Sequence, residues 1–256
     1  MAIKQKSTIR QTVILSGGRG ERLMPLTAHL NKGMIPVAGR PFLEHLIELF
    51  KKNGIHRFLI LTGHAAESIT NYFGDGKKWG VDISYQYAPR EINHGKRLAL
   101  ALPLIDDFFI LHRNDIYWPF DLKKHLDHFQ KLKVPALMTV YRNRNKDGIY
   151  GPDSNVRLNE KGLIERYDDL LSPNPFYHGQ DLGFFLLKKQ TLLDNLPAEV
   201  PDDFCLHHKW LSRLAERGLL GAYPTDIPAT TTTDAKWLKK AEEYFKIVSD
   251  NYSSSN

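Results

Sequence analysis

A buried-strand pattern that runs directly into a glycine-rich turn is the feature that most restricts how this chain folds. The run reads Val13-Ile14-Leu15-Ser16-Gly17-Gly18-Arg19-Gly20-Glu21-Arg22-Leu23. Glycine adopts backbone angles that other residues avoid and lets a ligand approach the main chain closely. Successive exposed N–H groups form a concave anion site, and arginine adds planar, multidentate donors. The run therefore predicts a site for a phosphorylated ligand; the alternative is a plain strand-to-helix turn with solvated arginines.

The spacing of the glycines excludes two well-known loops. A P-loop has four residues between its glycines and then Gly-Lys-Ser/Thr, which this run lacks. In the dinucleotide fingerprint, Gly18 and Gly20 fit the first two positions, but Leu23 stands at the third glycine. The loop therefore predicts a nucleotide site of another design.

Composition restricts the class of protein further. The chain has 256 residues, 42% hydrophobic and 25% charged, which suits one large domain with a substantial core. Cys205 is its single cysteine, which excludes an intrachain disulfide and a zinc cluster built from cysteines. There is no signal-peptide pattern and no apolar run of about 20 residues, so we expect a cytoplasmic protein without a membrane partner.

The basic residues are scattered rather than gathered into a run. The formal net charge is +6, which indicates a basic surface or attraction of a polyanionic small molecule. No zinc-finger spacing or RNA-binding aromatic signature accompanies it, so we expect no nucleic-acid partner.

Strand-like and helix-like segments alternate along the chain, which predicts an α/β fold with a parallel sheet and helices on both faces. The predicted strands are Val13–Leu15, Arg57–Leu61, Val81–Tyr87, Phe108–Leu111, Ala136–Tyr141 and Gly183–Leu187, with a hairpin in Val156–Tyr167. The predicted helices are Phe42–Lys52, Ala66–Phe73, Arg97–Leu102, Leu122–Leu132, Lys209–Glu216 and Trp237–Ser249.

A second polar cluster, His112-Arg113-Asn114-Asp115, directly follows a predicted strand. Ligands in open α/β sheets lie beyond the carboxyl ends of the strands, so Asp115 is a candidate ligand for a divalent metal opposite the glycine loop. Magnesium suits this position, because it favours one or two carboxylates together with substrate phosphates. Lys32 lies in a loop that we expect to be exposed, where its ammonium would neutralise charge on a phosphoryl group under attack.

Three blocks of the sequence, in order, resemble the opening of the sugar-1-phosphate nucleotidylyltransferases. That family shows Gly-Gly-x-Gly-x-Arg-Leu-x-Pro-Leu-Thr, Pro-Lys-Pro and Pro-Val-x-Gly-x-Pro. The corresponding blocks here are Gly17 to Thr27, Asn31-Lys32-Gly33, and Pro36-Val37-Ala38-Gly39-Arg40-Pro41. The resemblance covers nearly half of the chain well and the rest more weakly.

The resemblance implies a Rossmann-like, mostly parallel central sheet and a Mg²⁺-dependent reaction. In that reaction a sugar-1-phosphate oxygen attacks the α-phosphorus of a nucleoside triphosphate and releases pyrophosphate. One domain over residues 1–256 would comprise a nucleotide-binding half, roughly 10–121, and an acceptor-binding half, roughly 122–250; a homo-oligomer is possible. Short members of the family make bacterial cell-envelope precursors.

The resemblance also assigns roles to individual residues. Arg22 and Lys32 would be catalytic, and Asp115 would hold Mg²⁺. Because no covalent intermediate is needed, Cys205 has no expected role. The implied nucleotide-binding residues are Ser16, Gly17, Gly18, Gly20, Arg22 and Gly95, and the implied acceptor-binding residues are Asp181 and Gly183.

Several positions depart from the family pattern. The family's Pro-Lys-Pro is Asn31-Lys32-Gly33, which we expect to loosen the backbone around the lysine. The family's Gly-Thr-Ala/Gly-Gly-Ala segment, which helps to seat the base and the sugar, corresponds to Gly95-Lys96-Arg97-Leu98-Ala99. The larger and basic residues should narrow that side of the pocket or change its charge. The family's sugar-facing Glu-Lys-Pro reads Asp168-Asp169-Leu170, and its Asn-Gly-Asp reads Arg113-Asn114-Asp115.

The family's second metal-binding aspartate has no certain counterpart. An ungapped count back from the last helix gives Thr231, whereas Asp226 needs a short insertion and Asp234 is a third candidate. We take Asp226 as the second metal ligand. Two alternatives to a sugar-phosphate transferase remain: a relative that binds a nucleotide sugar without turnover, and a transferase acting on a non-sugar phosphate such as phosphocholine.

Overall fold

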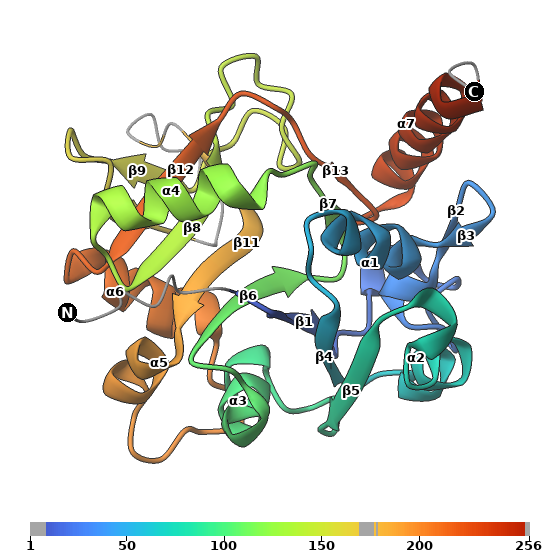
Figure 1. Cartoon of the computed structure of the whole chain (residues 1–256), viewed down its shortest axis with the longest axis horizontal. Helices are drawn as coiled ribbons and strands as arrows, with labels where there is room; N and C mark the ends of the chain where they lie inside the picture. Colours follow the sequence, from blue (N-terminus) through green and yellow to red (C-terminus); the bar gives the residue numbers. More distant parts are fainter. Residues whose placement is uncertain (1–8, 169–176, 178, 254–256) are drawn as a thin grey trace, which may run out of the picture.

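A seven-stranded sheet forms the centre of the computed structural model, which describes residues 9–168, 177 and 179–253 (Figure 1). The strands lie in the order β12-β8-β11-β6-β1-β4-β5. Their bounds are β1 Gln11–Ser16, β4 Arg57–Thr62, β5 Asp82–Tyr87, β6 Phe108–Arg113, β8 Ala136–Tyr141, β11 Gln180–Lys188 and β12 Leu220–Thr225.

Strand β11 is the one antiparallel member of this sheet. The pairs β1–β4, β1–β6, β4–β5 and β8–β12 are parallel, whereas β11 runs antiparallel to both β6 and β8. Parallel strands bury both faces under their crossover helices, so their sequences are almost continuously apolar. The expected mostly parallel α/β sheet with helices on both faces is confirmed.

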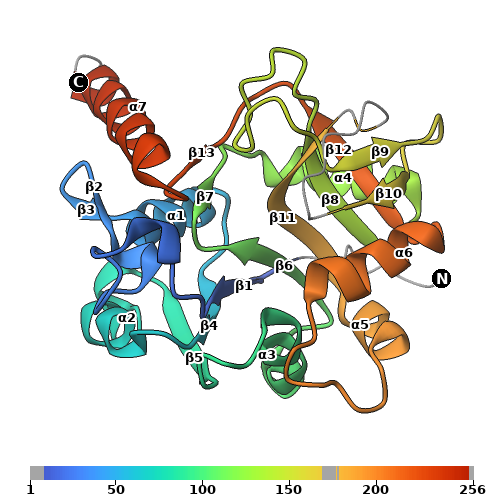
Figure 2. The same cartoon turned by 180° about the vertical axis from the view of Figure 1, so that it is seen from behind.

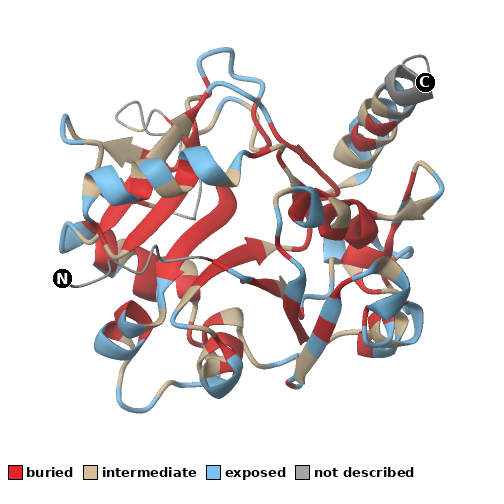
Figure 3. Cartoon of the chain, viewed as in Figure 1, coloured by how far each residue is buried: buried red, intermediate tan, exposed pale blue. Residues whose placement is uncertain are grey.

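Alternate residues of each strand enter different cores. In β1, Val13 packs into one core and Ile14 into the other, because successive side chains of a strand point to opposite faces. Buried residues line both faces of the sheet (Figure 3). One core takes its helical residues from α1 Phe42–Lys52, α2 Ala66–Phe73, α4 Leu122–Leu132 and α7 Ala235–Ser253. The other takes them from α3 His94–Leu100, α5 Lys189–Asn195 and α6 Ser212–Glu216, seen from behind in Figure 2.

Three short strand pairs lie outside the central sheet. They are β2 Pro36–Val37 with β3 Arg40–Pro41, β7 Ile116–Tyr117 with β13 Thr230–Thr231, and β9 Val156–Leu158 with β10 Ile164–Tyr167. The last pair is the predicted hairpin. The β7–β13 pair attaches the segment before α7 to the segment that follows Asp115. Short 3₁₀ turns occupy Glu21–Leu23, Lys32–Met34, Lys77–Trp79 and Leu102–Leu104.

The helices differ from the sequence expectation at several places. Helix α5 was not predicted, and α7 begins before and ends after its predicted bounds. Helix α3 begins at His94, three residues before the predicted start, because the Asn93 side chain accepts the His94 N–H at 2.7 Å and caps the helix. The predicted helix at Lys209–Glu216 is the second part of a longer helical segment that opens with a π-helical turn, Leu206–Leu211. Strand β12 carries Pro224, which an edge strand tolerates. Among the described residues, no helix is long and apolar enough to span a membrane.

The backbone at the start of α3 packs directly against residues 202–206. The Asn93 N–H donates to the Asp202 carbonyl at 2.7 Å, and the Gly95 N–H to the Phe204 carbonyl at 3.1 Å. A Cβ on Gly95 would lie 2.4 Å from the Phe204 carbonyl oxygen, closer than any real contact. Glycine at position 95 therefore permits two main-chain segments to approach each other.

We expect Gly95→Ala to lower the free energy of unfolding by about 1–3 kcal/mol, because its methyl group forces these two segments apart. Urea denaturation measures the change. Gly18→Ala is the matched control, since a Cβ there meets no atom within 4 Å, and it should leave the unfolding free energy nearly unchanged. Equal effects of the two substitutions would contradict this explanation.

Candidate active site

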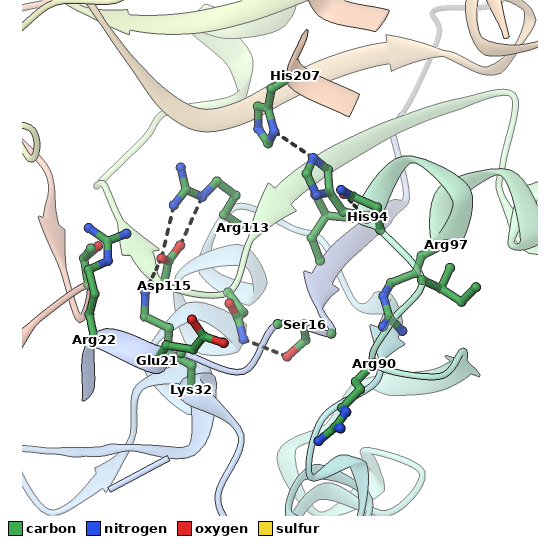
Figure 4. Close-up of a pocket in the computed structure, with 18 of the residues that line it drawn as sticks. Ser16, Glu21, Arg22, Lys32, Arg90, His94, Arg97, Arg113, Asp115 and His207 are labelled. Carbon is green, nitrogen blue, oxygen red and sulfur yellow. Dashed lines mark hydrogen bonds and ion pairs between the residues drawn. The ribbon is translucent and has the colours of Figure 1, made fainter. Parts of the chain in front are cut away.

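A cavity of about 710 Å³ opens beyond the carboxyl ends of β1 and β6, where the sequence predicts a ligand (Figure 4). Its described walls carry five basic and three acidic side chains, so the cavity favours an anion. Of the residues proposed from the sequence, it brings together Ser16, Gly17, Gly18, Gly20, Arg22, Lys32 and Asp115. Gly95, Asp181, Gly183 and Asp226 are not among the residues that line it.

The glycine loop leaves its main chain open to the cavity. Gly20 has a left-handed backbone (φ 64°) and begins the 3₁₀ turn that carries Arg22. The Thr27 hydroxyl and the Leu23 N–H both donate to the Gly20 carbonyl at 2.9 Å, which fixes the turn. A Cβ on Gly18 would meet nothing within 4 Å. The loop can therefore present its N–H groups to a phosphate without moving.

The buried side chain of Asn31 links the segments that form the glycine-loop side of the cavity. Its amide nitrogen donates to the carbonyls of Ser16 (2.8 Å) and His64 (3.0 Å). Its amide oxygen accepts from the Ser16 hydroxyl (3.0 Å), the Gly33 N–H (3.0 Å) and the Asn114 amide (3.1 Å). The expectation of a loosened backbone was therefore wrong, because the asparagine replaces the rigidity of proline with a hydrogen-bond network.

Lys32 is largely covered rather than exposed, which corrects a second expectation. Only 12% of its side chain is accessible, and its Nζ lies 2.6 Å from Asp115 Oδ2. Arg113 reaches the same carboxylate through Nε and one terminal nitrogen, each at 3.2 Å. Burial opposes ionisation of Asp115, but the charges of Arg113 and Lys32 outweigh it and hold the pKa of this carboxyl well below its usual range. Asp115 is therefore anionic and accepts from two cations.

Arg113, which the sequence did not single out as a site residue, links the phosphate side of the cavity to the opposite wall. Its other terminal nitrogen donates to the Tyr150 hydroxyl at 2.8 Å. Its side chain passes Gly183, where a Cβ would lie 2.7 Å from Arg113 Cδ. Asp181 accepts from the Tyr167 hydroxyl at 3.0 Å, and Tyr167 lines the cavity. Asp181 and Gly183 therefore support the wall from behind.

The segment Gly95–Ala99, which departs from the family's glycine- and alanine-rich pattern, affects the cavity mainly through Arg97. This side chain is 3% exposed, and its guanidinium donates to the carbonyls of Thr62, Ala88 and Pro89 at 2.5–2.6 Å. A Cβ on Gly17 would lie 2.5 Å from Arg97 Nε, so the arginine fills the space beside the glycine loop. Lys96 instead reaches the Val200 carbonyl, and Leu98 lies in the core.

The second metal ligand is where the sequence interpretation differs most from the observed positions. Asp226 is 56% exposed in its side chain and pairs with Arg142 outside the cavity walls. Asp234 accepts the Trp237 N–H and caps α7. Thr231, given by the ungapped count, donates its hydroxyl to the Asp115 carbonyl at 2.5 Å, and Thr233 lines the cavity. Among the described residues, threonines occupy the place opposite Asp115.

Other residues of the cavity walls were not predicted from the sequence. His94 and His207 both line it, and their ring nitrogens lie 2.8 Å apart. Tyr150 and Asn155 add hydroxyl and amide groups on the side contributed by the second half of the chain. The two histidines lie at the starts of helical segments, whereas Tyr150 and Asn155 lie in loops, and no sequence motif marks any of the four. Of the departures read from the sequence, Asp169 and Leu170 lie outside the described residues.

Comparisons with known proteins identify the family of this chain. A family model for nucleotidyl transferases matches residues 11–164. The chain is 25% identical to the D-glycero-alpha-D-manno-heptose 1-phosphate guanylyltransferase of Campylobacter jejuni, over 78% of this chain and 81% of that protein. It is 30% identical to the UTP–glucose-1-phosphate uridylyltransferase of Synechocystis, over 50% of this chain and 37% of that protein. The match to a low-salt glycan biosynthesis nucleotidyltransferase of Haloferax volcanii is 36% identical, over 61% of this chain and 44% of that protein. The chain thus spans less than half the length of the last two relatives.

Solved structures share the fold at low sequence identity. HddC from Yersinia pseudotuberculosis superposes with a TM-score of 0.77 at 19% identity, over 93% of this chain and all of that one. A UDP-glucose pyrophosphorylase complexed with UDP-glucose gives 0.74 at 17% identity, over 93% of this chain and 99% of that one. The family model, which matches more than half of the chain, shows that the chain belongs to the nucleotidyl transferase family.

Proposed function

We propose that this protein joins a nucleoside triphosphate to a sugar-1-phosphate, forming a nucleotide sugar and pyrophosphate. The observation that carries the proposal is the basic cavity, in which an open glycine loop, Arg22 and Lys32 lie together with Asp115. The complex of HddC with GMP-PN shows that a protein of this fold accepts a nucleotide. The heptose-phosphate guanylyltransferase, a match over most of both chains, suggests a sugar phosphate as acceptor.

The loop side of the cavity would bind the triphosphate. The open main chain at Gly17, Gly18 and Gly20 offers N–H groups to phosphate oxygens, and the exposed Arg22 offers a planar fork. The attacked bond joins the α-phosphorus to the oxygen that leaves with pyrophosphate. Donors on the β- and γ-phosphates stabilise the negative charge that this oxygen gains.

Lys32 would act at the α-phosphoryl group. Its ammonium already lies inside the cavity, held by the 3₁₀ turn that Asn31 caps. In the transition state the α-phosphoryl oxygens carry the developing charge, and a preorganised ammonium stabilises it without reorganisation. The attacking group is a phosphate oxygen that is already ionised, so the step needs no general base.

The acceptor would lie against the wall contributed by the second half of the chain. Tyr150, Tyr167 and Asn155 present groups that hydrogen-bond sugar hydroxyls. Asp181 and Gly183 would act on the acceptor indirectly, because they position Tyr167 and Arg113. A non-sugar phosphate such as phosphocholine remains the alternative acceptor, and the same assay can include it.

Members of this family generally use a divalent metal, and Asp115 is the candidate ligand for Mg²⁺ here. Mg²⁺ binds through one or two carboxylates together with substrate phosphates, so a single aspartate meets the minimum. Lys32 and Arg113 contact that carboxylate and would have to turn toward the phosphates first. Asp226 is not retained as the second ligand, because it is not among the residues that line the cavity and its carboxylate pairs with Arg142. When bound, Mg²⁺ would neutralise phosphate charge.

One observation favours a second candidate function, the binding of a nucleotide sugar without turnover. Two cations hold Asp115, and threonines stand opposite it instead of a second carboxylate. Such a cavity attracts a nucleotide through its own fixed charges. It would then bind ligand in the absence of Mg²⁺ and release no pyrophosphate.

We expect Lys32→Ala to lower turnover at least about 100-fold, because the charge at the α-phosphoryl group is lost. It should also lower the free energy of unfolding by about 1–3 kcal/mol, since Asp115 loses a buried partner. Pyrophosphate release and urea denaturation measure the two effects. Lys123→Ala, which removes an exposed lysine of α4, serves as control and should change neither. Near-normal turnover of Lys32→Ala would contradict the assigned role.

A panel of nucleoside triphosphates and acceptor phosphates distinguishes the two candidates. The transferase releases pyrophosphate with Mg²⁺ and stops when EDTA is added, because the triphosphate charge is no longer neutralised. The binding protein instead gains thermal stability from a nucleotide sugar in the presence of EDTA, and it releases no pyrophosphate with any substrate of the panel. Absence of both turnover and stabilisation, in folded protein, would refute both.

A further inference from the structure

Two imidazoles and the only thiol of the chain meet at the start of α3, beside the cavity. His94 is the first residue of α3, whereas Cys205 and His207 flank the beginning of the π-helical turn. One donor atom from each residue lies within 4.8 Å of the other two. His94 Nε2 is 2.8 Å from His207 Nδ1 and 3.7 Å from Cys205 Sγ. Neither the family resemblance nor the proposed transfer uses this cluster.

We propose that His94, Cys205 and His207 bind a divalent cation of the zinc class. In a tetrahedral site with Zn–N of about 2.0–2.1 Å and Zn–S of about 2.3 Å, the donors lie about 3.4–3.6 Å apart. The separation of His94 Nε2 from His207 Nδ1, 2.8 Å, is below that range, and its separation from Cys205 Sγ, 3.7 Å, is slightly above it. All three donor atoms lie within 4.8 Å of one another, so side-chain rotations would bring them to bonding distance of one ion.

The hydrogen bonds of His94 show which of its ring nitrogens faces the other two proposed ligands. The Leu206 N–H donates to His94 Nε2 at 3.2 Å, which places the proton of this ring on Nδ1. Nε2 is therefore the acceptor nitrogen of this ring and the one that can bind a metal. Metal binding would replace its hydrogen bonds to Leu206 and His207, and the His207 proton would move from Nδ1 to Nε2.

The nearby positive charges have acceptors of their own. Arg113 pairs with Asp115, which it shares with Lys32, and the Arg97 guanidinium donates to three carbonyls. Binding would release the Cys205 proton, and the resulting thiolate supplies a negative charge to the ion. Nitrogen and sulfur donors select zinc-class ions over Mg²⁺, so this site is distinct from the one proposed at Asp115.

The ligand-bearing segments are held in place before any metal arrives. Main-chain hydrogen bonds join Asn93 to Asp202 and Gly95 to Phe204, on both sides of His94. A metal site whose backbone is already fixed loses little conformational entropy on binding. His94 and His207 both line the cavity, so the fourth coordination position faces it and remains open to a water or a ligand oxygen.

Titration of the tag-free, chelator-treated full chain with Co²⁺ tests the site. We expect one equivalent to produce a thiolate-to-cobalt band in the near ultraviolet and intense visible bands typical of tetrahedral cobalt, both abolished by Zn²⁺. Elemental analysis after dialysis should find about one zinc per chain. Azide should shift the visible bands by entering the open position; bands that never respond to azide would refute that openness.

Cys205→Ser is expected to abolish the near-ultraviolet band and weaken metal binding at least tenfold, on the order of a lost ligand interaction. His29→Gln, which removes an exposed histidine, is the matched control and should retain the full spectrum. The proposal is overturned if the wild-type chain shows no thiolate band or if the band persists in Cys205→Ser. Neither result depends on pyrophosphate release, so the transferase proposal stands or falls separately.

Discussion

The hydrogen bonds of the buried Asn31 side chain are the constraint on which the cavity depends. They join the end of β1, the loop at His64, the Lys32 turn and Asn114. Several of these four segments lie far apart in the sequence. A buried amide with every donor and acceptor satisfied is costly to distort, because each broken bond leaves a desolvated polar group. The glycine loop, the lysine and the aspartate are therefore fixed relative to one another before a ligand enters.

The electrostatic balance of the cavity follows from this arrangement. Lys32 and Arg113 share one carboxylate, so the cavity holds positive charge at fixed positions without a bound ion. The same two groups compete with a metal for Asp115. In the transferase, Lys32 and Arg113 would turn toward the phosphates and release Asp115 for a metal. In the binding protein, both side chains would stay with the carboxylate.

Local signals in the sequence were enough to predict the architecture and the phosphate side of the site. Continuous apolar runs and helical periodicity located most strands and helices, and the glycine loop, Lys32 and Asp115 do lie together. Burial of Lys32 was missed because it depends on Asn31 contacts with residues up to 83 positions away. The role of Thr231 was missed because Asp226 offered a closer dipeptide match, although only tertiary pairing of β13 with β7 decides which residue faces Asp115.

The cavity takes its walls from nearly the whole chain, from Leu15 at the end of the first strand to Thr233 just before the last helix. Contacts between residues so distant in sequence close late in folding, because the loop-closure entropy must be overcome before they form. A partly synthesised chain can build the first four parallel strands and still lack the opposite wall. Ligand affinity therefore reports on completion of the entire fold, and a bound nucleotide selectively stabilises only chains that have finished folding.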